Sequence, residues 1–396
     1  MPLPIDQLDF HLPDRLLATE PAEPRDSAKL LVVDRAADRV AHHRVRDLPD
    51  LGVLTADDLV VVNDTRVAPA YLVATRAATG GRVTGLVLDT DLAATPLVLT
   101  LLLESRGKPQ PGESLIIQPA TATPDGPPIR PSADPPTLTL RESLGHGKWL
   151  ATLAAGTLDD LHALGATPLP PYIRKARRHH GQPELNPADP ARYNTVYASA
   201  DPAAARSAAA PTAGLHFTPQ LLDRLPCPLT RVTLHVGQGT FAPVRTDDLD
   251  DHPIHAEFIE VTQAACDAIV ACRARGGNIL AVGTTTLRCL ESLPAADATS
   301  PRPSGVGLNA SPLPYTGPTD LFITPTRTAL PPGHPDRFAF RFTDRLMTNF
   351  HLPKSTLLAL VAALPGLSVD RLLALYQEAI AHEYRFYSYG DAMLIV

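Results

Sequence analysis

Residues 71–153 contain only strand-like segments, and this block constrains the possible folds of the chain more than any other feature. Its apolar runs, among them YLVATRA, RVTGLVLD, PLVLTLLLE and KWLATLAA, are separated by Gly and Pro turns and show no helical periodicity. Such a succession predicts a small antiparallel barrel or sandwich.

The sequence on both sides of this block alternates strands with helices. We expect buried strands at 29–35, 58–64, 229–236 and 278–283, and helices at 219–225 and 262–275. This alternation is typical of a mostly parallel sheet covered by helices. The chain of 396 residues is long enough for two domains. We therefore predict an α/β domain formed by 1–70 and 154–396, with a small antiparallel β domain inserted at 71–153.

Composition excludes several classes of protein. The N-terminus lacks the basic segment and apolar run of a secretion signal, and the longest apolar helix candidate, 357–366, is too short to cross a bilayer. We therefore expect a cytoplasmic protein without membrane contact. The four cysteines form no Cys-x-x-Cys pair, which argues against a zinc ribbon or a redox dithiol. The net charge of −7 argues against a surface coated with nucleic acid but leaves room for a local basic patch.

Two polar or small-residue segments are candidate binding loops. Asn63, Asp64 and Arg66 follow a buried strand, at the end where ligands bind in open α/β sheets. The turn Pro211-Thr212-Ala213-Gly214 lets a ligand approach the backbone, and His216 follows it. The alternative for this turn is simple packing of small residues, with His216 as a structural histidine.

Two further segments place polar groups before a helix. Gly283, Thr284, Thr285 and Thr286 follow the 278–283 strand, and free amide N–H groups at a helix start favour a carboxylate or phosphate. Ordinary N-capping by threonine would explain the same residues. Segment 349–356 repeats the pattern with Asn349 and Lys354, which suit an anionic or zwitterionic ligand, unless the lysine is a solvated surface charge.

Other segments carry acids, histidines or aromatic rings. His252, His255 and Glu257 are spaced loosely like metal ligands, but the His-Glu-x-x-His pattern is absent, so we expect no metal and instead polar site residues. His235 ends a strand before a glycine turn. Tyr387, Tyr389 and Asp391 lie in a C-terminal aromatic segment, which could hold a base or cation or serve as a buried anchor.

A basic run offers a phosphate-binding surface. It contains Arg174, Lys175, Arg177 and Arg178, beside Tyr172 and Tyr193. A solvated charge run is the alternative interpretation.

Taken together, eight segments resemble one family, S-adenosylmethionine:tRNA ribosyltransferase-isomerase of queuosine biosynthesis. They are NDTRV (63–67), PLPPYI (168–173), RYNTVYA (192–198), APTAGLHFT (210–218), LHVGQGTF (234–241), GTTTLRCLES (283–292), TNFHLPKSTLL (348–358) and YRFYSYGDAMLI (384–395). The resemblance implies a β-barrel inserted into an α/β domain. It also implies transfer and isomerisation of the ribosyl group of S-adenosylmethionine onto 7-aminomethyl-7-deazaguanine at the tRNA wobble position, giving epoxyqueuosine and releasing adenine and methionine.

The resemblance also suggests roles for the candidate residues. Removal of the proton beside the sulfonium needs a base that titrates near neutral pH, for which His216 is the first choice and His235 and His351 are alternatives. Asp391 or Glu257 would protonate the leaving adenine. The methionine carboxylate suits Thr284–Thr286, and the sulfonium suits Tyr387 or Tyr389. The expected partners are the tRNA anticodon loop and S-adenosylmethionine as substrate, with no cofactor and a monomeric protein.

Some positions depart from the pattern of the family. Arg206 replaces a glycine, Asn194 a glutamine, Ala242 an arginine and Gly85 a glutamate. Several of these positions lie in turns that could touch the acceptor. A free deazapurine or another small acceptor, or a non-catalytic paralogue that binds S-adenosylmethionine or RNA, therefore remain alternatives.

Overall fold

The computed structural model describes residues 3–396 apart from 92, 121–134, 202–203, 238–243, 245, 297–299, 302–307 and 310. It divides into two compact units. Unit 1 comprises Met1–Thr65, Thr195–Ala200 and Pro211–Val396, and unit 2 comprises Arg66–Asn194 and Asp201–Ala210. Unit 2 is thus wider than the predicted insertion at 71–153, because it also includes three helices and a short strand pair.

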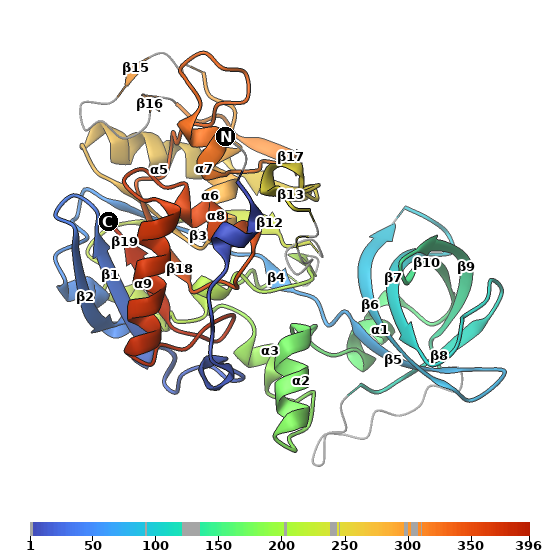
Figure 1. Ribbon diagram of the computed structural model, residues 1–396. Coiled ribbons are helices and arrows are strands. Elements are labelled where there is room, and N and C mark those ends of the chain that lie inside the picture. Colours follow the sequence, from blue (N-terminus) through green and yellow to red (C-terminus); the bar gives the residue numbers. More distant parts are fainter. Residues whose placement is uncertain are drawn as a thin grey trace. The chain divides into compact units, whose positions relative to one another are not determined.

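Unit 1 contains a nine-stranded mixed sheet with the order β17-β13-β12-β3-β14-β18-β19-β1-β2 (Figure 1). Its strands are β1 (Lys29–Asp34), β2 (Arg39–Arg44), β3 (Leu59–Asn63), β12 (Leu229–His235), β13 (Glu257–Val261), β14 (Ile279–Val282), β17 (Tyr315–Thr319), β18 (Arg345–Asn349) and β19 (Ala392–Ile395). The central strands β12, β3, β14 and β18 are parallel, as is the β19/β1 pair. The other pairs are antiparallel, so parallel pairing is less widespread than the sequence predicts.

Some helices of unit 1 begin at the caps that the sequence predicts. The helices of this unit are α4 (Pro219–Asp223), α5 (Gln263–Ala274), α6 (Thr284–Glu291), α7 (Pro325–Ala329), α8 (Thr356–Ala362) and α9 (Val369–Ala381), besides a short strand pair, β15 (Ser300–Pro301) and β16 (Leu308–Asn309). Thr218 and Thr262 cap α4 and α5 as predicted, each accepting a bond from the backbone N–H three residues on. Val60, Val62 and Val282 lie in the apolar core, which explains the apolar runs of β3 and β14.

Unit 2 contains a closed six-stranded antiparallel barrel with the order β10-β7-β6-β5-β8-β9, which confirms the predicted inserted barrel. Its strands are β5 (Tyr71–Arg76), β6 (Arg82–Asp91), β7 (Val98–Ser105), β8 (Ser114–Gln118), β9 (Thr137–Gly145) and β10 (Lys148–Ala155). The remaining elements are α1 (Leu158–Leu164), α2 (Pro171–His179), α3 (Asp189–Arg192) and the parallel pair of β4 (Arg66–Val67) with β11 (Ala205–Ser207). Alternate strand residues such as Leu99, Leu101 and Ala151 fill the barrel core.

In the part of the chain that the structure describes, every helix is too short or too polar to cross a membrane.

Candidate active site

The four central parallel strands of unit 1 all end on the same side of the sheet. The row formed by the carboxyl-terminal ends of these strands is called here the carboxyl edge. Asn63, His235 and Asn349 are the last residues of β3, β12 and β18, and Gly283 follows β14. Because parallel strands end on the same side, these groups from distant parts of the sequence gather there. The sequence predicts Asn63, His235 and Gly283 at strand ends but places Asn349 only before a helix; the sheet order makes all four neighbours.

Two antiparallel strands bring acidic residues to the same edge. Ala392 of β19 pairs with Asn349, so Asp391, the residue before β19, lies where β18 ends. Phe258 of β13 pairs with His235, which places Glu257 where β12 ends. The antiparallel pairs therefore add the two predicted carboxylates to the carboxyl edge.

Asn63 fixes the ends of β3 and β12. Its side chain is fully buried; Nδ2 donates to the Leu234 carbonyl at 3.0 Å and to Thr285 Oγ1 at 3.3 Å. Its Oδ1 accepts from the backbone N–H groups of Leu234 at 3.0 Å and Thr65 at 3.1 Å. Asp64, the next residue, accepts from Thr233 Oγ1 at 2.7 Å. Both predicted residues thus hold the strand ends in place.

The turn from β14 into α6 presents backbone groups to the carboxyl edge. Gly283 has φ of +95°, a conformation that side chains other than glycine rarely adopt. No side chain among the described residues caps α6, and the first N–H groups of a helix lack intrahelical partners. Thr286 Oγ1 is already bonded, because it donates to the carbonyl of Val282 at the end of β14 at 2.7 Å. The anion-binding capacity of this turn therefore lies in the backbone of Thr284 and Thr285.

The small-residue loop 211–214 lies against this turn. Its residues Thr212–Gly214 form a 3-10 helix, and a Cβ atom added at Gly283 would lie 3.6 Å from Ala213 Cβ. Gly214 is required here, because a Cβ atom at this position would lie 1.8 Å from the Tyr197 hydroxyl oxygen. The buried Pro211 precedes this turn. The loop therefore is a close-packed wall of the carboxyl edge.

Asn349 connects this loop to His216. Its Oδ1 accepts from Thr212 Oγ1 at 2.9 Å, and its Nδ2 lies 3.2 Å from His216 Nε2 and 3.5 Å from the Asp391 carbonyl oxygen. Because an amide nitrogen only donates, His216 Nε2 accepts in this pair. Asn349 thus orients the loop, the histidine and the start of β19 together.

Burial, together with the positive charges of Arg385 and Arg25, lowers the pKa of His216 to about 3. The imidazole is therefore neutral at physiological pH. His216 does not meet the requirement for a base that titrates near neutrality. The sequence contains no signal for Arg25, which lies in a proline-rich segment without a motif, and it indicates Arg385 only as part of the family segment 384–395, without a role of its own.

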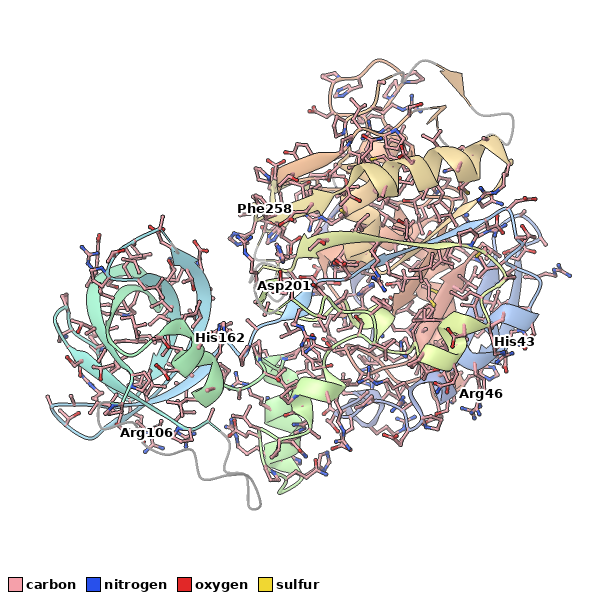
Figure 2. All side chains as sticks on the ribbon, turned by 180° about the vertical axis from the view of Figure 1, so that it is seen from behind. His43, Arg46, Arg106, His162, Asp201 and Phe258 are labelled. Atoms are coloured by element: carbon pink, nitrogen blue, oxygen red, sulfur yellow. The ribbon has the colours of Figure 1, made fainter. Side chains whose placement is uncertain are left out.

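The other two candidate histidines differ in their contacts. Burial lowers the pKa of His351 to about 4, and its Nε2 lies 2.9 Å from Thr348 Oγ1. His235 Nδ1 lies 3.0 Å from Thr65 Oγ1, and its Nε2 lies 3.5 Å from a Glu260 carboxylate oxygen. The His235 ring stacks on the ring of Phe258, which is labelled in Figure 2, with the ring centroids 6.4 Å apart.

Asp391 is held by donors on two sides. Its Oδ1 accepts from the Lys29 backbone N–H at 3.0 Å, and its Oδ2 accepts from the Arg385 backbone N–H at 2.8 Å. Tyr387, between Arg385 and Asp391 in the sequence, adopts a positive φ of +73° and donates its backbone N–H to the Phe350 carbonyl. Tyr389 is almost fully buried. These contacts shape the 384–391 turn at the carboxyl edge.

Glu257 forms a buried ion pair with Arg288 and accepts from the Gly237 backbone N–H at 3.0 Å. Arg288, which sequence analysis did not single out, also donates to the Leu321 carbonyl at 3.1 Å. Within the described residues, His252 and His255 do not join Glu257 in a group of three ligand atoms that could share a metal.

Lys354 is committed to the N-terminal segment. Its Nζ lies 2.6 Å from Asp6 Oδ1 and 3.1 Å from Asp9 Oδ2, and these hydrogen bonds raise the pKa of the lysine. In the described structure its charge is thus partnered by carboxylates.

The predicted basic residues belong to unit 2, as does Arg66. Arg177 is buried and makes two 2.9 Å hydrogen bonds to Asp189, so its guanidinium is part of the protein interior. Arg174 donates to the Tyr71 hydroxyl at 2.8 Å. Lys175 and Arg178 are exposed, Arg178 beside Glu184 at 2.7 Å.

Comparison with known proteins identifies the family. A model of the queuosine biosynthesis protein family matches residues 5–395. The S-adenosylmethionine:tRNA ribosyltransferase-isomerase of Acidithiobacillus ferrooxidans is 44% identical over 393 residues, which cover 98% of this chain and 97% of that protein. That of Caulobacter vibrioides is 42% identical over 404 residues, covering 99% and 98%.

Among solved structures, the S-adenosylmethionine tRNA ribosyltransferase of Thermotoga maritima is 28% identical, with a TM-score of 0.47 and coverage of 98% of this chain and 100% of that one. The family match spans nearly the whole sequence, including every segment that forms the carboxyl edge. The chain therefore belongs to the queuosine biosynthesis protein family.

Proposed function

We propose that the protein transfers and isomerises the ribosyl moiety of S-adenosylmethionine onto 7-aminomethyl-7-deazaguanine in the tRNA anticodon loop, giving epoxyqueuosine and releasing adenine and methionine. The observation that carries this proposal is the gathering at the carboxyl edge of unit 1 of residues from six family segments, namely Asn63, His216, His235, Gly283, Asn349 and Asp391. The relatives, over 40% identical along nearly their whole length, bear the name of this reaction. The protein would work as a cytoplasmic monomer, with S-adenosylmethionine as substrate and no cofactor.

The methionine end of the substrate would lie at the start of α6. Its carboxylate would accept hydrogen bonds from the backbone N–H groups of Thr284 and Thr285, where the helix dipole favours an anion. Gly283 and the loop 211–214 carry little side-chain bulk, so the ligand can approach the backbone closely. Asn63 supports this turn through its 3.3 Å contact with Thr285.

We assign proton removal beside the sulfonium to His235. A general base is typically held by a third group, and His235 lies between Thr65 and Glu260. His216, with its pKa of about 3, is too weak a base for efficient transfer near neutral pH, and His351 has the same disadvantage. His216 would instead orient the substrate together with Asn349.

The acids and aromatic residues of the edge would position the substrate. Asp391 and Glu257 both accept hydrogen bonds from backbone N–H groups and face arginines, so we assign them to the shape of the pocket wall. Tyr387 and Tyr389 lie in the turn that Asp391 holds, where an aromatic face would stabilise the sulfonium.

Unit 2 would contribute to tRNA binding through α2. Lys175 and Arg178 present exposed charges, which suit the phosphate backbone. Arg177 is excluded from this role by its buried pairing with Asp189.

The departures from the family pattern do not all bear on the acceptor. Asn194 accepts from the Val67 backbone N–H and donates to the Pro190 carbonyl, both at 3.0 Å, so it has a structural role within unit 2. Gly85 lies in the barrel, where an added Cβ would lie 2.8 Å from Leu103. Arg206 is exposed on β11, and Ala242 lies outside the described residues.

The acceptor is tested by incubating the pure protein with S-adenosylmethionine and following adenine and methionine by mass spectrometry. The proposal predicts release only with tRNA that carries the deazaguanine precursor, together with epoxyqueuosine in the digested tRNA. Release with the free deazapurine alone would assign a small acceptor. No release with either would indicate a non-catalytic paralogue.

A further inference from the structure

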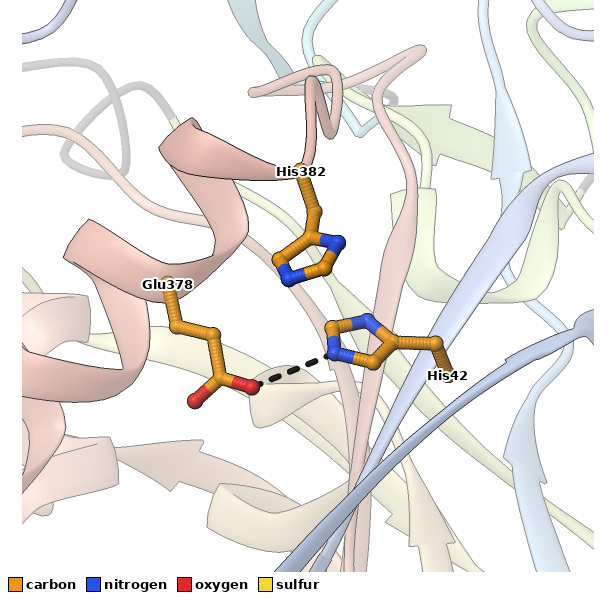
Figure 3. A group of neighbouring side chains, drawn as sticks. All are labelled: His42, Glu378 and His382. Carbon is orange, nitrogen blue, oxygen red and sulfur yellow. Dashed lines mark hydrogen bonds and ion pairs between the residues drawn. The ribbon is translucent and has the colours of Figure 1, made fainter.

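Away from the carboxyl edge, two histidines and a glutamate come together on the surface of unit 1. His42 belongs to the edge strand β2, whereas Glu378 lies in the last turn of α9 and His382 is the residue that directly follows this helix (Figure 3). One ligand atom from each residue lies within 4.8 Å of the other two. Spacing of four residues places Glu378 and His382 on one helix face, opposite the strand.

The His42 ring is oriented by contacts at both nitrogens. Its Nδ1 lies 2.9 Å from the Tyr384 hydroxyl, and its Nε2 lies 3.1 Å from Glu378 Oε1. The His42 and His382 rings stack with their centroids 4.1 Å apart. A histidine that binds a metal through one nitrogen is commonly held by a hydrogen bond at the other, and Tyr384 supplies such a partner.

Two nearby cations are already engaged with carbonyl oxygens. Lys29 Nζ donates to the carbonyls of His382 at 2.7 Å and Glu383 at 2.8 Å. The Arg44 guanidinium donates to the Ser27 carbonyl. The Glu378 carboxylate supplies the negative charge that a bound cation needs.

We propose that His42, Glu378 and His382 bind one divalent transition-metal ion of the Zn²⁺ class, with water completing the coordination. Two imidazoles and a carboxylate are a common ligand set for Zn²⁺. Tetrahedral bonds of about 2.1 Å place the donor atoms about 3.4 Å apart. The His42 and Glu378 atoms are already at 3.1 Å, and His382 is exposed, so rotation of its side chain closes the site.

Metal binding would replace the hydrogen bond between His42 Nε2 and Glu378 and release any proton held between them. The ion would fasten the edge strand β2 to the end of α9, directly before the 384–391 turn that carries Asp391. The inferred site is thus structural and does not depend on the proposed reaction.

The test uses the full chain, without an affinity tag, after treatment with a chelator and its removal. Zn²⁺ alone is titrated by calorimetry, Co²⁺ is added to record visible absorption, and thermal unfolding is followed with and without Zn²⁺. The variants are Glu378→Gln, His382→Ala and Tyr384→Phe. The control is His11→Ala, which removes an exposed histidine outside the cluster.

The proposal predicts one equivalent of bound Zn²⁺, tetrahedral Co²⁺ bands and a higher Tm with metal. Glu378→Gln and His382→Ala should weaken binding at least about tenfold, and Tyr384→Phe about tenfold through the orientation of His42, while His11→Ala binds as wild type. Unchanged far-ultraviolet circular dichroism without metal shows that each variant folds. Absence of saturable binding, or wild-type affinity in Glu378→Gln and His382→Ala, would overturn the proposal.

Discussion

Replacing Gly214 with alanine puts a methyl group where the structure has no room for one. The added Cβ would lie 1.8 Å from the Tyr197 hydroxyl oxygen, 2.9 Å from Tyr197 Cζ and 3.0 Å from Thr195 Cγ2. Gly214 and Tyr197 are both buried, so the ring or the loop 211–214 must move. Overpacking of this kind costs about 1–3 kcal/mol of folding free energy.

The same displacement reaches the proposed substrate site, because Thr212 binds Asn349 and Ala213 lies beside Gly283. A shift that costs 1.4 kcal/mol of binding free energy weakens the affinity about tenfold. We therefore expect Gly214→Ala to lower the Tm and to weaken S-adenosylmethionine binding at least about tenfold.

A double-mutant cycle with Tyr197→Phe tests the cause. The Tyr197 hydroxyl is buried without a hydrogen-bond partner among the described residues, so its removal alone should cost little. In the Gly214→Ala background, Tyr197→Phe relieves the 1.8 Å contact. It should therefore recover part of the lost stability and part of the lost S-adenosylmethionine affinity, with a coupling energy of about 0.5–3 kcal/mol.

Gly237→Ala is the matched control at the same sheet edge, because among the described residues its Cβ would meet Glu257 atoms at 3.7 and 3.9 Å, an ordinary contact. Thermal unfolding and calorimetric titration with S-adenosylmethionine measure both effects. Wild-type stability of Gly214→Ala, or no recovery with Tyr197→Phe, would refute the reasoning.

Three further predictions follow from burial and charge. The pKa of His216 is near 6.5 in the unfolded chain but about 3 in the folded protein, so only the unfolded state takes up this proton as the pH falls from 6.5 to 3. The free energy of unfolding should therefore drop between about pH 6.5 and 3, by up to roughly 5 kcal/mol. Denaturant titrations at several pH values measure this dependence, which His216→Gln should flatten. The double variant Lys175→Ala/Arg178→Ala should weaken tRNA binding and make it less dependent on salt in filter-binding assays, and an unchanged salt slope would exclude this surface. Arg177→Ala leaves the buried Asp189 unpaired and should destabilise the protein by about 3–5 kcal/mol in thermal unfolding, which a solvated arginine would not do.

Local patterns were sufficient for much of the fold. The continuous apolar run of β3 predicts a strand buried on both faces, and Thr262 with the following periodicity predicts α5. The antiparallel edges of the sheet were not predictable, because strand direction depends on pairings between distant segments, such as β18 with β19.

The candidate site was predictable only in part, for the same reason. The positions of Asn63, Gly283 and Asn349 at element ends follow from the local sequence. The bond from Asn349 to His216 spans 133 positions, and burial is what lowers the pKa of that histidine. Arg177 belongs to the same basic run of sequence as the exposed Lys175 and Arg178, yet its side chain is buried and pairs with Asp189, 12 positions away.

The histidine pair of the proposed metal site gave no sequence signal. His42 and Glu378 are 336 positions apart in the sequence. A search for closely spaced ligands therefore finds only Glu378 and His382. The sequence therefore predicted no metal, and the proposal rests on the fold.

Hydrogen–deuterium exchange of the full chain with and without S-adenosylmethionine tests the position of the substrate site most directly. Binding should slow amide exchange in 211–218, 283–287 and 349–351, the segments that meet at the carboxyl edge, while the barrel strands β7 and β10 keep their rates. Protection confined to the barrel, or saturable binding without protection in these three segments, would contradict the proposed site.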